Sequence, residues 1–287
     1  MKPLRHALGP IALGAIIVTT GCTCDPTERP ATVAGHPSIR IATWNIKHGR
    51  GLDDMVDLAR TTDVLRTIDA DVVALQEVDE RVRRSGGVDQ ARRVGDDLDM
   101  HPMFGSFMDH QGGRYGLAIL SRLPVDSSEE WRLSDGNEPR VALSARLESP
   151  DGGILTVIAV HFDWVDDDGF RFKQATETMR RIRELDTPWV VLGDFNDTPD
   201  SRTMQGFREL GRDASKPEDA RHTFPADDPR IEIDFIVVGP PERWRIDEVV
   251  VIDETIASDH RPVRAVLSLL PSGSDEVVPR RKKTPGS

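Results

Sequence analysis

The chain has 287 residues, a net charge of −12 and a sequence pI near 5.2. An acidic protein gains little from counterion release on a polyanion, so this charge argues against a tight, non-catalytic nucleic-acid binder but permits an enzyme that handles phosphate through a bound cation. Both cysteines, Cys22 and Cys24, lie near the N-terminus, so no disulfide framework can hold the fold together. The length suits one large domain or two small ones.

The N-terminal segment has the three parts of an export signal. A basic start precedes an apolar run over 11–18 that is too short to span a membrane, and small residues follow up to Gly21 and Cys22. The pair also resembles the cleavage box of bacterial lipoproteins, although Thr19 stands where Leu or Val is usual. We expect residues 1–21 to be an export or lipoprotein signal and Cys22 to be lipidated. A core helix is the alternative, which the internal Gly and Thr residues weaken.

Both ends of the chain outside this signal are expected to be non-globular. Residues 22–36 are rich in Pro, Thr and Gly and are interpreted as a tether. Residues 271–287 have no apolar periodicity and are predicted to be a disordered tail. The basic run 280–283 could touch anionic lipid or nucleic acid, but a solvated tail is the simpler interpretation. Residues 37–270 are therefore the predicted folded domain.

Strand-like and helical patterns alternate along this domain. Several strand-like runs are continuously apolar, as expected of strands buried on both faces. Apolar residues at three- and four-residue steps predict helices over 55–68 and 172–185. The predicted strands are 38–46, 71–78, 117–121, 141–147, 154–162, 189–195, 233–239, 249–252 and 263–269. This mixture indicates packed sheets with helices outside, in an α/β or α+β sandwich.

Polar side chains occur in, or at the end of, one apolar strand after another. They are Asn45, Glu77, His161, Asp194, Asn196 and Asp234. Burying charged groups is costly unless they are paired or bind a metal, so their repetition predicts that the strand ends converge on one polar site. Each residue also has a simpler interpretation. His161 could be a satisfied strand-end histidine, Glu77 could pair with Arg81 or Arg84, and His260 could cap a loop.

Seven short motifs, five of which carry these residues, occur in chain order: TWNI, LQEVD, RYGLAILSR, VHFDW, GDFN, IDFIVV and SDHRP, the last with Asp259 and His260. In this order and spacing they resemble the DNase I-like endonuclease/exonuclease/phosphatase superfamily, from Ile39 to about Leu270. The resemblance implies an α/β (α+β) four-layer sandwich, in which two facing, mostly antiparallel β-sheets are flanked by helices and the site lies at one edge. It also implies a metal-dependent phosphoric-ester hydrolase.

The resemblance assigns three residues to a Mg²⁺ or Mn²⁺ site. A phosphodiester is anionic, so its hydrolysis needs a cation, an oriented water and an acid for the leaving oxygen. Glu77 is an oxygen donor of the kind that Mg²⁺ takes, usually one or two carboxylates together with waters. Asn45 offers a neutral amide oxygen beside it, and Asp259 completes or flanks the metal site.

The remaining motif residues are assigned to catalysis by the same resemblance. Asp194 is expected to orient and deprotonate the attacking water, and Asn196 to hold water or phosphate. His260, paired with Asp234, is expected to stabilise the transition-state phosphate as a charged imidazole. His161 is expected to assist at the phosphate or the leaving group. The residues that follow Asn196 are ordinary turn residues leading into a further helix.

The segment after the first strand departs from two branches of the superfamily. In the abasic-site repair branch an Asp near the metal follows two residues after the Asn, whereas Lys47 stands here. The stretch NIKHGRGLDD is closer to a bacterial branch that usually reads Asn-Ile-His-His-Gly, with Lys47 replacing the first His. The repair-type metal shell is therefore in doubt, and His48 and Arg50 are candidate substrate contacts.

Two further positions are expected to face the phosphate. Either Arg114 or Tyr115 precedes the strand AILSR at a phosphate-facing position, and the register is ambiguous by one residue, with Arg114 slightly favoured. Arg140 is a candidate phosphate clamp, because a guanidinium can bind phosphate through two hydrogen bonds. These positions complete the expected substrate-binding set.

Together these patterns predict an exported phosphoesterase that acts on phosphodiesters, with a lipid headgroup or another small phosphodiester favoured. We expect a monomer attached to the membrane through its N-terminal lipid, on the periplasmic or cell-surface side. An extracellular or periplasmic nuclease for DNA or RNA is the main alternative, and phosphomonoesters are a third substrate class. A non-catalytic tethered binding module would be expected to lose some of these motifs. A calcineurin-like phosphoesterase would require a Gly-Asn-His motif, which the sequence lacks.

Overall fold

The computed structural model describes residues 37–271, and within this range twelve strands form two six-stranded sheets. One sheet has the spatial order β11 (Trp244–Val251), β12 (Val263–Leu269), β1 (Ser38–Asn45), β2 (Val72–Glu80), β4 (Gly113–Ser121), β3 (His101–His110). The other has the order β5 (Val125–Arg132), β6 (Val141–Glu148), β7 (Ile154–His161), β8 (Trp189–Asp194), β10 (Asp234–Gly239), β9 (Arg212–Asp213). Each sheet contains one parallel pair, β1–β2 or β7–β8, and its other pairs are antiparallel.

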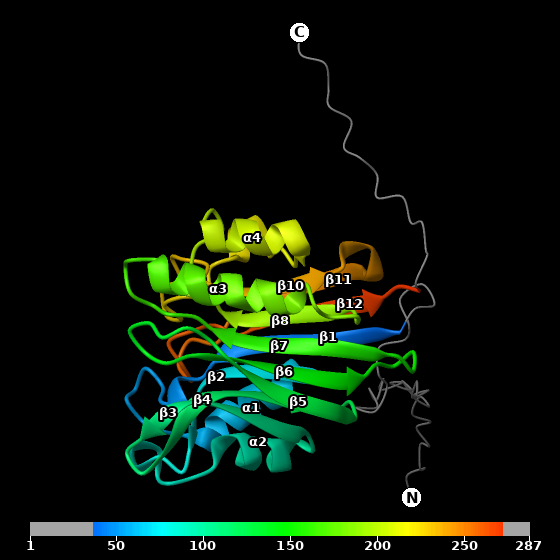
Figure 1. Cartoon of the computed structure of the whole chain (residues 1–287). Coiled ribbons are helices and arrows are strands. Elements are labelled where there is room, and N and C mark those ends of the chain that lie inside the picture. The colour runs from blue at the N-terminus through cyan, green and yellow to red at the C-terminus, as the bar shows by residue number, and fades with distance from the viewer. Residues whose placement is uncertain (1–36, 272–287) are drawn as a thin grey trace, which may run out of the picture. The chain divides into compact units, whose positions relative to one another are not determined.

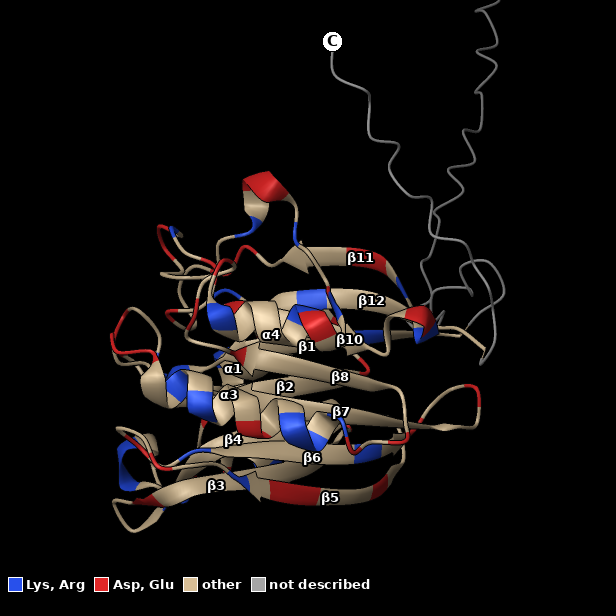
Figure 2. Cartoon of the chain, turned by 45° about the horizontal axis from the view of Figure 1, so that its top comes forward, with Lys and Arg blue, Asp and Glu red and all other residues tan. Residues whose placement is uncertain are grey.

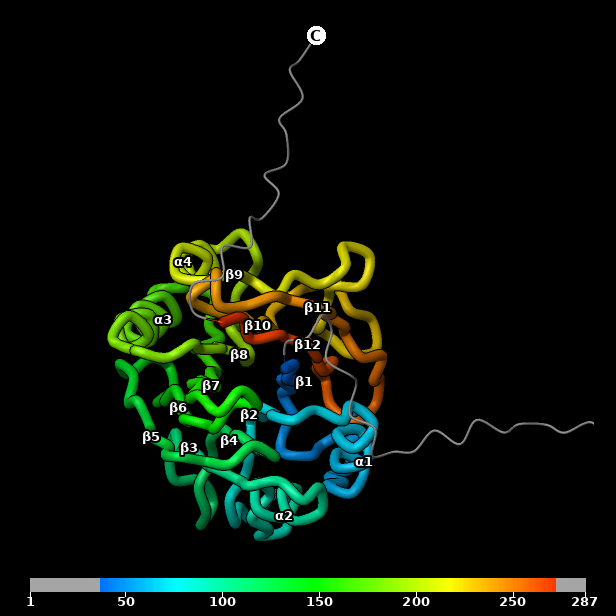
Figure 3. Tube along the Cα trace, turned by 90° about the vertical axis from the view of Figure 1, so that its right-hand side faces the viewer, coloured from blue at the N-terminus to red at the C-terminus, as the bar shows by residue number. Residues whose placement is uncertain are grey.

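Two helices cover the outer face of each sheet (Figures 1 and 3). Helices α1 (Leu58–Ile68) and α2 (Gln90–Leu98) bury their apolar faces on the first sheet. Helices α3 (Gly169–Ile182) and α4 (Arg202–Leu210) do the same on the second sheet. A third apolar cluster fills the space between the sheets. The predicted four-layer sandwich of two facing, mostly antiparallel sheets is therefore confirmed. No helix in this part of the chain is long and apolar enough to cross a membrane.

The boundaries of the helices follow local chemistry. Asp57 caps α1 by accepting a hydrogen bond from the backbone N–H of Arg60 at 3.0 Å, so the helix begins after the predicted start at residue 55. Asp89 and Ser201 cap α2 and α4 in the same way. Helix α3 lies three residues closer to the N-terminus than predicted. Four short 3₁₀ turns also occur: Lys47–Gly49, Arg83–Ser85, Glu218–Ala220 and Pro241–Arg243.

The predicted strands are present with shifted ends, but four elements were not predicted. Strand β5 is an exposed edge strand with no apolar run, and β9 has only two residues. Strand β3 contains Pro102 and Gly105, which are both unfavourable in strands. Helix α2 has only nine residues, and Gly95 lies within it. The predicted signal, the lipidated Cys22, the tether and the tail beyond residue 271 lie outside the described residues.

The strand directions give the sandwich two different edges. We call the edge at which β1, β2, β7 and β8 end, and at which β4, β10 and β12 begin, the polar edge. At the opposite edge the described chain begins and ends. There Leu269 N donates to Pro37 O at 3.4 Å, and Leu270 N donates to Arg243 O at 2.8 Å. Figure 1 shows the polar edge on the left.

Candidate active site

The polar strand-end residues converge at the polar edge, where one side chain joins the two sheets. Asn45 at the end of β1 donates from Nδ2 to Glu77 Oε1 and to Asp194 Oδ2, both at 3.1 Å. Its Oδ1 accepts a hydrogen bond from Lys47 N at 3.1 Å, which fixes the orientation of the amide. Asn45 therefore orients two carboxylates with its nitrogen, and the amide oxygen expected at a metal is already hydrogen-bonded.

Glu77 reaches this position through an irregularity in β2. The register with β4 shifts between Gln76 and Val78, and Glu77 between them has a φ of 57°. A non-glycine residue in this left-handed region costs about 1–3 kcal/mol and is retained where the surroundings demand it. The extra residue turns Glu77 away from the regular alternation of the strand and toward Asn45.

Asp194 lies at the centre of the cluster and is almost fully buried. Its Oδ1 accepts a hydrogen bond from the backbone N–H of Asn196 at 2.9 Å. Its Oδ2 faces the Asn45 amide, and also His161 Nε2 at 3.5 Å and His260 Nε2 at 3.7 Å. Burial raises the pKa of Asp194 to about 7, although the charge of His260 acts in the other direction. A carboxylate with such a pKa can accept a proton near neutral pH.

His260 is held as a cation between two carboxylates. Its Nδ1 lies 3.0 Å from Asp234 Oδ2. Burial by itself would lower the pKa of His260, but the charges of Asp234 and Asp194 outweigh it and raise the pKa to about 10. The backbone of His260 is fixed as well, since its carbonyl oxygen accepts a hydrogen bond from Trp44 Nε1 at 2.8 Å. A partly buried Phe224 ring packs against the imidazole, with ring centroids 4.9 Å apart.

The other imidazole, His161, is neutral. Its Nδ1 lies 3.2 Å from Nη1 of the buried Arg140, which can only donate, so the imidazole proton resides on Nε2 and points toward Asp194. Burial and the positive charges of Arg140 and His260 hold the pKa of His161 well below its ordinary value. Arg140 also donates to Glu138 Oε2 at 3.0 Å, and its guanidinium lies 4.9 Å from the centre of the Phe107 ring.

Glu77 and Asp259 are two acidic residues that could hold a divalent cation. Burial raises the pKa of Glu77, the hydrogen bond from Asn45 acts in the other direction, and the nearby charge of Asp259 raises it further. Asp259 Oδ2 lies 2.7 Å from Lys47 Nζ, so this lysine already offers it a positive charge. Oxygen donors of this kind suit Mg²⁺ and Mn²⁺.

A second group of potential ligands has a different explanation. Ligand atoms of Asp194, Asp234 and His260 lie within 4.8 Å of one another. The pKa of His260 is raised to about 10, so a metal at its ring nitrogen would have to displace a proton. The hydrogen bond to Asp234 and the charge facing Asp194 account for this cluster without a metal.

The structure separates the two candidates for the phosphate-facing position before AILSR. Tyr115 is buried between the sheets, and burial together with the charge of Glu77 raises its pKa. Arg114 is exposed and donates to Glu80 through two hydrogen bonds of 2.6 and 2.7 Å. The register therefore favours Tyr115, in contrast to the sequence-based preference for Arg114.

The two remaining substrate-contact candidates lie to one side of the cluster. His48 is buried, and burial together with the charge of Arg84 lowers its pKa to about 4. Its carbonyl oxygen accepts a hydrogen bond from Gln90 Nε2 at 2.7 Å. Arg50 is paired with the exposed Asp54 at 2.8 Å. Neither residue has a contact with Asp194 among the described interactions, so their assignment to substrate stays a prediction.

Two aromatic residues beside the cluster were missed by the sequence analysis, and one arginine has a partner other than the one considered there. Phe107 packs edge-on against both His161 and Tyr115, and it lies on the unpredicted strand β3. Phe224 lies in the loop before β10, where no motif marks it. Arg84 was considered as a partner of Glu77, but it donates twice to the buried Asp79 at 2.9 Å and lies over the Tyr115 ring.

Comparison with known sequences decides the family. The sequence model of the endonuclease/exonuclease/phosphatase family matches residues 42–260. The chain belongs to this family. The family is hydrolytic, and its members act as phosphoesterases, nucleases and phosphatases, typically with a divalent metal. The matched range runs from β1 to His260 and so contains each residue of the cluster.

Relatives and solved structures cover most of the domain. YbhP of Escherichia coli (strain K12), an uncharacterized protein, is 27% identical over 260 residues, which are 81% of this chain and 97% of that protein. A Bacteroides vulgatus endonuclease/exonuclease/phosphatase is 24% identical with a TM-score of 0.68, over 82% of this chain and 100% of that one. The mannosyl-6-phosphatase of Bacteroides thetaiotaomicron VPI-5482 is 19% identical with a TM-score of 0.66, over 80% of this chain and 100% of that one. These structural likenesses establish the fold.

Proposed function

We propose that this protein is a Mg²⁺- or Mn²⁺-dependent phosphodiesterase. The observation that carries the proposal is the setting of Asp194. Its buried carboxylate is faced by one neutral and one protonated imidazole, beside two carboxylates that suit a divalent cation. This combination offers a base, a cationic hydrogen-bond donor and a metal site within one cluster.

The residues divide the chemistry of hydrolysis between them. The oxygen of a water molecule attacks phosphorus, its proton passes to Asp194, and the bond from phosphorus to the leaving oxygen breaks. Of the two imidazoles, His260 is the one that holds a transferable proton, so it can protonate the leaving oxygen or stabilise the phosphate as a cation. His161 would stabilise the phosphate through its Nε2–H. A divalent cation held by Glu77 and Asp259 would supply charge that neutralises the phosphate.

The charge balance of the cluster supports a diester over a more highly charged substrate. Each cation near the cluster already has an acidic partner: Lys47 with Asp259, Arg140 with Glu138, and Arg84 with Asp79. A phosphodiester carries one negative charge, whereas a monoester dianion or a nucleic acid needs more compensation. A small diester is therefore the substrate that needs the least positive charge from the site.

A metal-dependence assay tests the proposal. The purified protein should hydrolyse bis-p-nitrophenyl phosphate with Mg²⁺ or Mn²⁺, should lose that activity in EDTA, and should regain it when the metal is restored. Undiminished turnover in chelator would overturn the metal requirement. A rate on p-nitrophenyl phosphate that exceeds the diester rate would overturn the preference for diesters.

The proposal extends to the location of the protein. We infer from the N-terminal sequence that the chain is exported, lipidated at Cys22, and held at a membrane as a monomer. Cells should incorporate labelled palmitate into the parental protein, and Cys22→Ser should abolish this labelling. Labelling that survives the substitution would contradict the anchor.

A further inference from the structure

The exposed large apolar side chains of the described residues all lie at the polar edge. They are Leu52, Met55, Val56, Val88, Trp164, Phe170, Ile231 and Ile256. Each belongs to a loop that joins strand ends there, or to the first turn of α3. Scattered exposed apolar residues are normal, but their confinement to one edge indicates a surface that meets an apolar partner.

Two loops bring several of these side chains together beside the metal candidates. Leu52 N donates to Ile256 O at 2.8 Å, so the loop after β1 lies against the loop before β12. The same two loops carry Lys47 and Asp259. Met55 and Ile256 are 63% and 51% exposed. These apolar side chains therefore lie on the loop of the proposed metal ligand Asp259 and on the loop beside it.

A third loop presents Trp164, which is 59% exposed, three residues after His161. This loop is held by hydrogen bonds, because the fully buried Asp163 accepts from Asn137 N at 2.6 Å and from Val165 N at 3.2 Å. Arg171 donates to the carbonyl oxygens of Asp163 and Val165, both at 3.0 Å. Buried hydrogen bonds of Asp163 and Arg171 thus fix the backbone on both sides of the exposed Trp164. This arrangement favours a surface at which Trp164 contacts a partner.

The charges between these apolar residues restrict the partner. Exposed acids such as Asp166, Asp167 and Asp227 lie in the same loops, and the loop of Val88 carries the exposed Arg81 and Arg83. Figure 2 shows segments of both charge signs at this edge. A rim of both signs gives no net attraction to a polyanion or an anionic bilayer, and it matches headgroups that carry both an ammonium group and a phosphate. Trp and Met side chains favour a membrane interface.

We propose that the polar edge docks onto a surface of zwitterionic phospholipid and that the substrate is the phosphodiester of a choline or ethanolamine headgroup. The apolar side chains enter the interface, the acids meet the ammonium group, and the phosphate reaches Asp194. This inference rests on the proposed function for the chemistry at Asp194, but the docking itself does not require turnover.

Trp164 provides a direct probe, because the other four tryptophans, Trp44, Trp131, Trp189 and Trp244, are buried. The full chain carrying Cys22→Ser is used, so that a lipid anchor cannot cause binding, and EDTA is present, so that no substrate is consumed. Phosphatidylcholine vesicles should shift the tryptophan emission to shorter wavelength and protect it from acrylamide. Trp164→Phe should abolish the shift, which assigns the signal to this residue.

Variants and competing ligands decide the outcome. Combined Met55→Ser, Trp164→Ser and Ile256→Ser should lower co-sedimentation with phosphatidylcholine vesicles at least about tenfold, because three insertable side chains are lost. Leu185→Ser, which removes a partly buried apolar side chain at the opposite edge, is the control for lost packing and should bind as the parent does. No shift with vesicles, equal or stronger binding to phosphatidylglycerol vesicles, or quenching by an oligonucleotide in place of vesicles would each overturn the proposal. Failure of the proposed function shows itself separately, as absent hydrolysis of bis-p-nitrophenyl phosphate with docking intact.

Discussion

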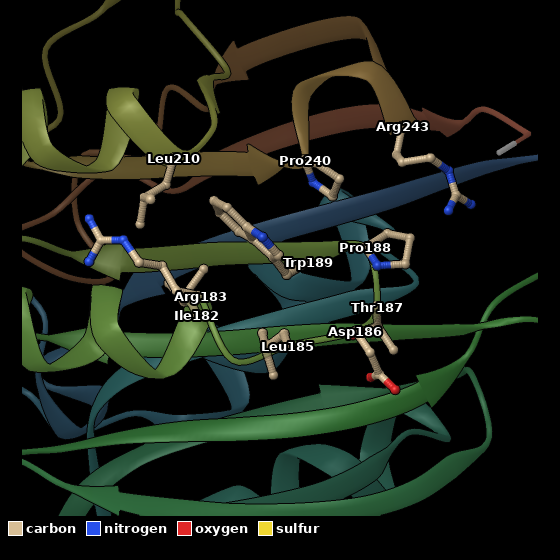
Figure 4. A pocket seen from close by; sticks show the side chains of 10 residues that line it. All are labelled: Ile182, Arg183, Leu185, Asp186, Thr187, Pro188, Trp189, Leu210, Pro240 and Arg243. Carbon is tan, nitrogen blue, oxygen red and sulfur yellow. The ribbon is translucent and has the colours of Figure 1, made fainter. Parts of the chain in front are cut away.

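The two edges of the sandwich are formed by the two ends of the same strands, but they bury different kinds of polar side chain. At the polar edge buried carboxylates face imidazoles, and polar atoms without a hydrogen-bond partner within the described part of the chain include Asp234 Oδ1 and Arg140 Nε in this cluster. At the opposite edge Thr156 and Thr187 satisfy each other at 2.6 Å, and a hollow of about 300 Å³ is lined by residues such as Trp189 and Arg243 (Figure 4). Costly buried charge is concentrated at one end of otherwise continuous apolar strands.

This difference teaches that the sandwich separates stability from chemistry. Along their length the strands bury apolar side chains, and this burial stabilises the fold. Charge is placed where each strand stops, so a charged side chain there disturbs few strand hydrogen bonds. If this view is correct, substitutions at the polar edge should change activity more than stability, and substitutions at the opposite edge should do the reverse.

The sharpest test of the comparison removes the proposed base. Asp194→Asn keeps the shape but cannot accept a proton, so kcat/KM on bis-p-nitrophenyl phosphate should fall by about 10²–10⁴-fold. The melting temperature should change little, because burial already disfavours the charged form of this carboxyl. Asp200→Asn is the matched control, since Asp200 is exposed in the same loop. Near-parental activity in Asp194→Asn would refute its role as base.

The pH dependence tests the coupling between Asp194 and His260. The rate should rise as pH passes about 7, where Asp194 loses its proton, and should fall only near 10, where His260 loses its own. The charge of His260 lowers the pKa of Asp194, so His260→Gln should move the rising limb to higher pH and reduce the rate. A rising limb that stays in place in this variant would show that the two groups do not interact.

A smaller effect is expected at Lys47. Its ammonium competes with a divalent cation for Asp259, and both side chains are partly exposed, so the ion pair is worth about 0.2–1 kcal/mol. Lys47→Met should therefore tighten Mn²⁺ binding up to about fivefold, as measured by isothermal titration calorimetry. Arg50→Met, which breaks an ion pair with Asp54 instead, is the control. Weaker Mn²⁺ binding in Lys47→Met would mean that the lysine supports the metal site.

Much of the fold could be predicted from the sequence because many of its strands coincide with apolar runs. The stretches 189–192 and 235–238 are short, continuous apolar runs, a pattern typical of buried strands. Strand β5 and helix α2 could not be found in this way, because β5 is exposed and α2 is short. Their formation depends on neighbours that the local sequence does not reveal.

The candidate site was predictable in its composition but not in its geometry. The motifs name Asp194 and His260, whereas the choice between Arg114 and Tyr115 depends on the register of β4 against a bulged β2. Because side chains alternate across a strand, one residue of shift exchanges the two faces. The orientation of the Asn45 amide is likewise set by three partners that come from separate segments.

The smallest change in activity should come from the opposite edge. Thr187→Val removes the hydroxyl partner of the buried Thr156, and an unsatisfied buried hydroxyl costs about 1–3 kcal/mol. For a domain of this size each kcal/mol lowers the melting temperature by about 2–4 °C. Calorimetry should detect this loss while kcat/KM on bis-p-nitrophenyl phosphate stays at the parental value. A tenfold fall in kcat/KM would instead show that a packing change at this edge is propagated along β7 and β8 and alters the site at Asp194. Stability and chemistry would then not be separated between the two edges.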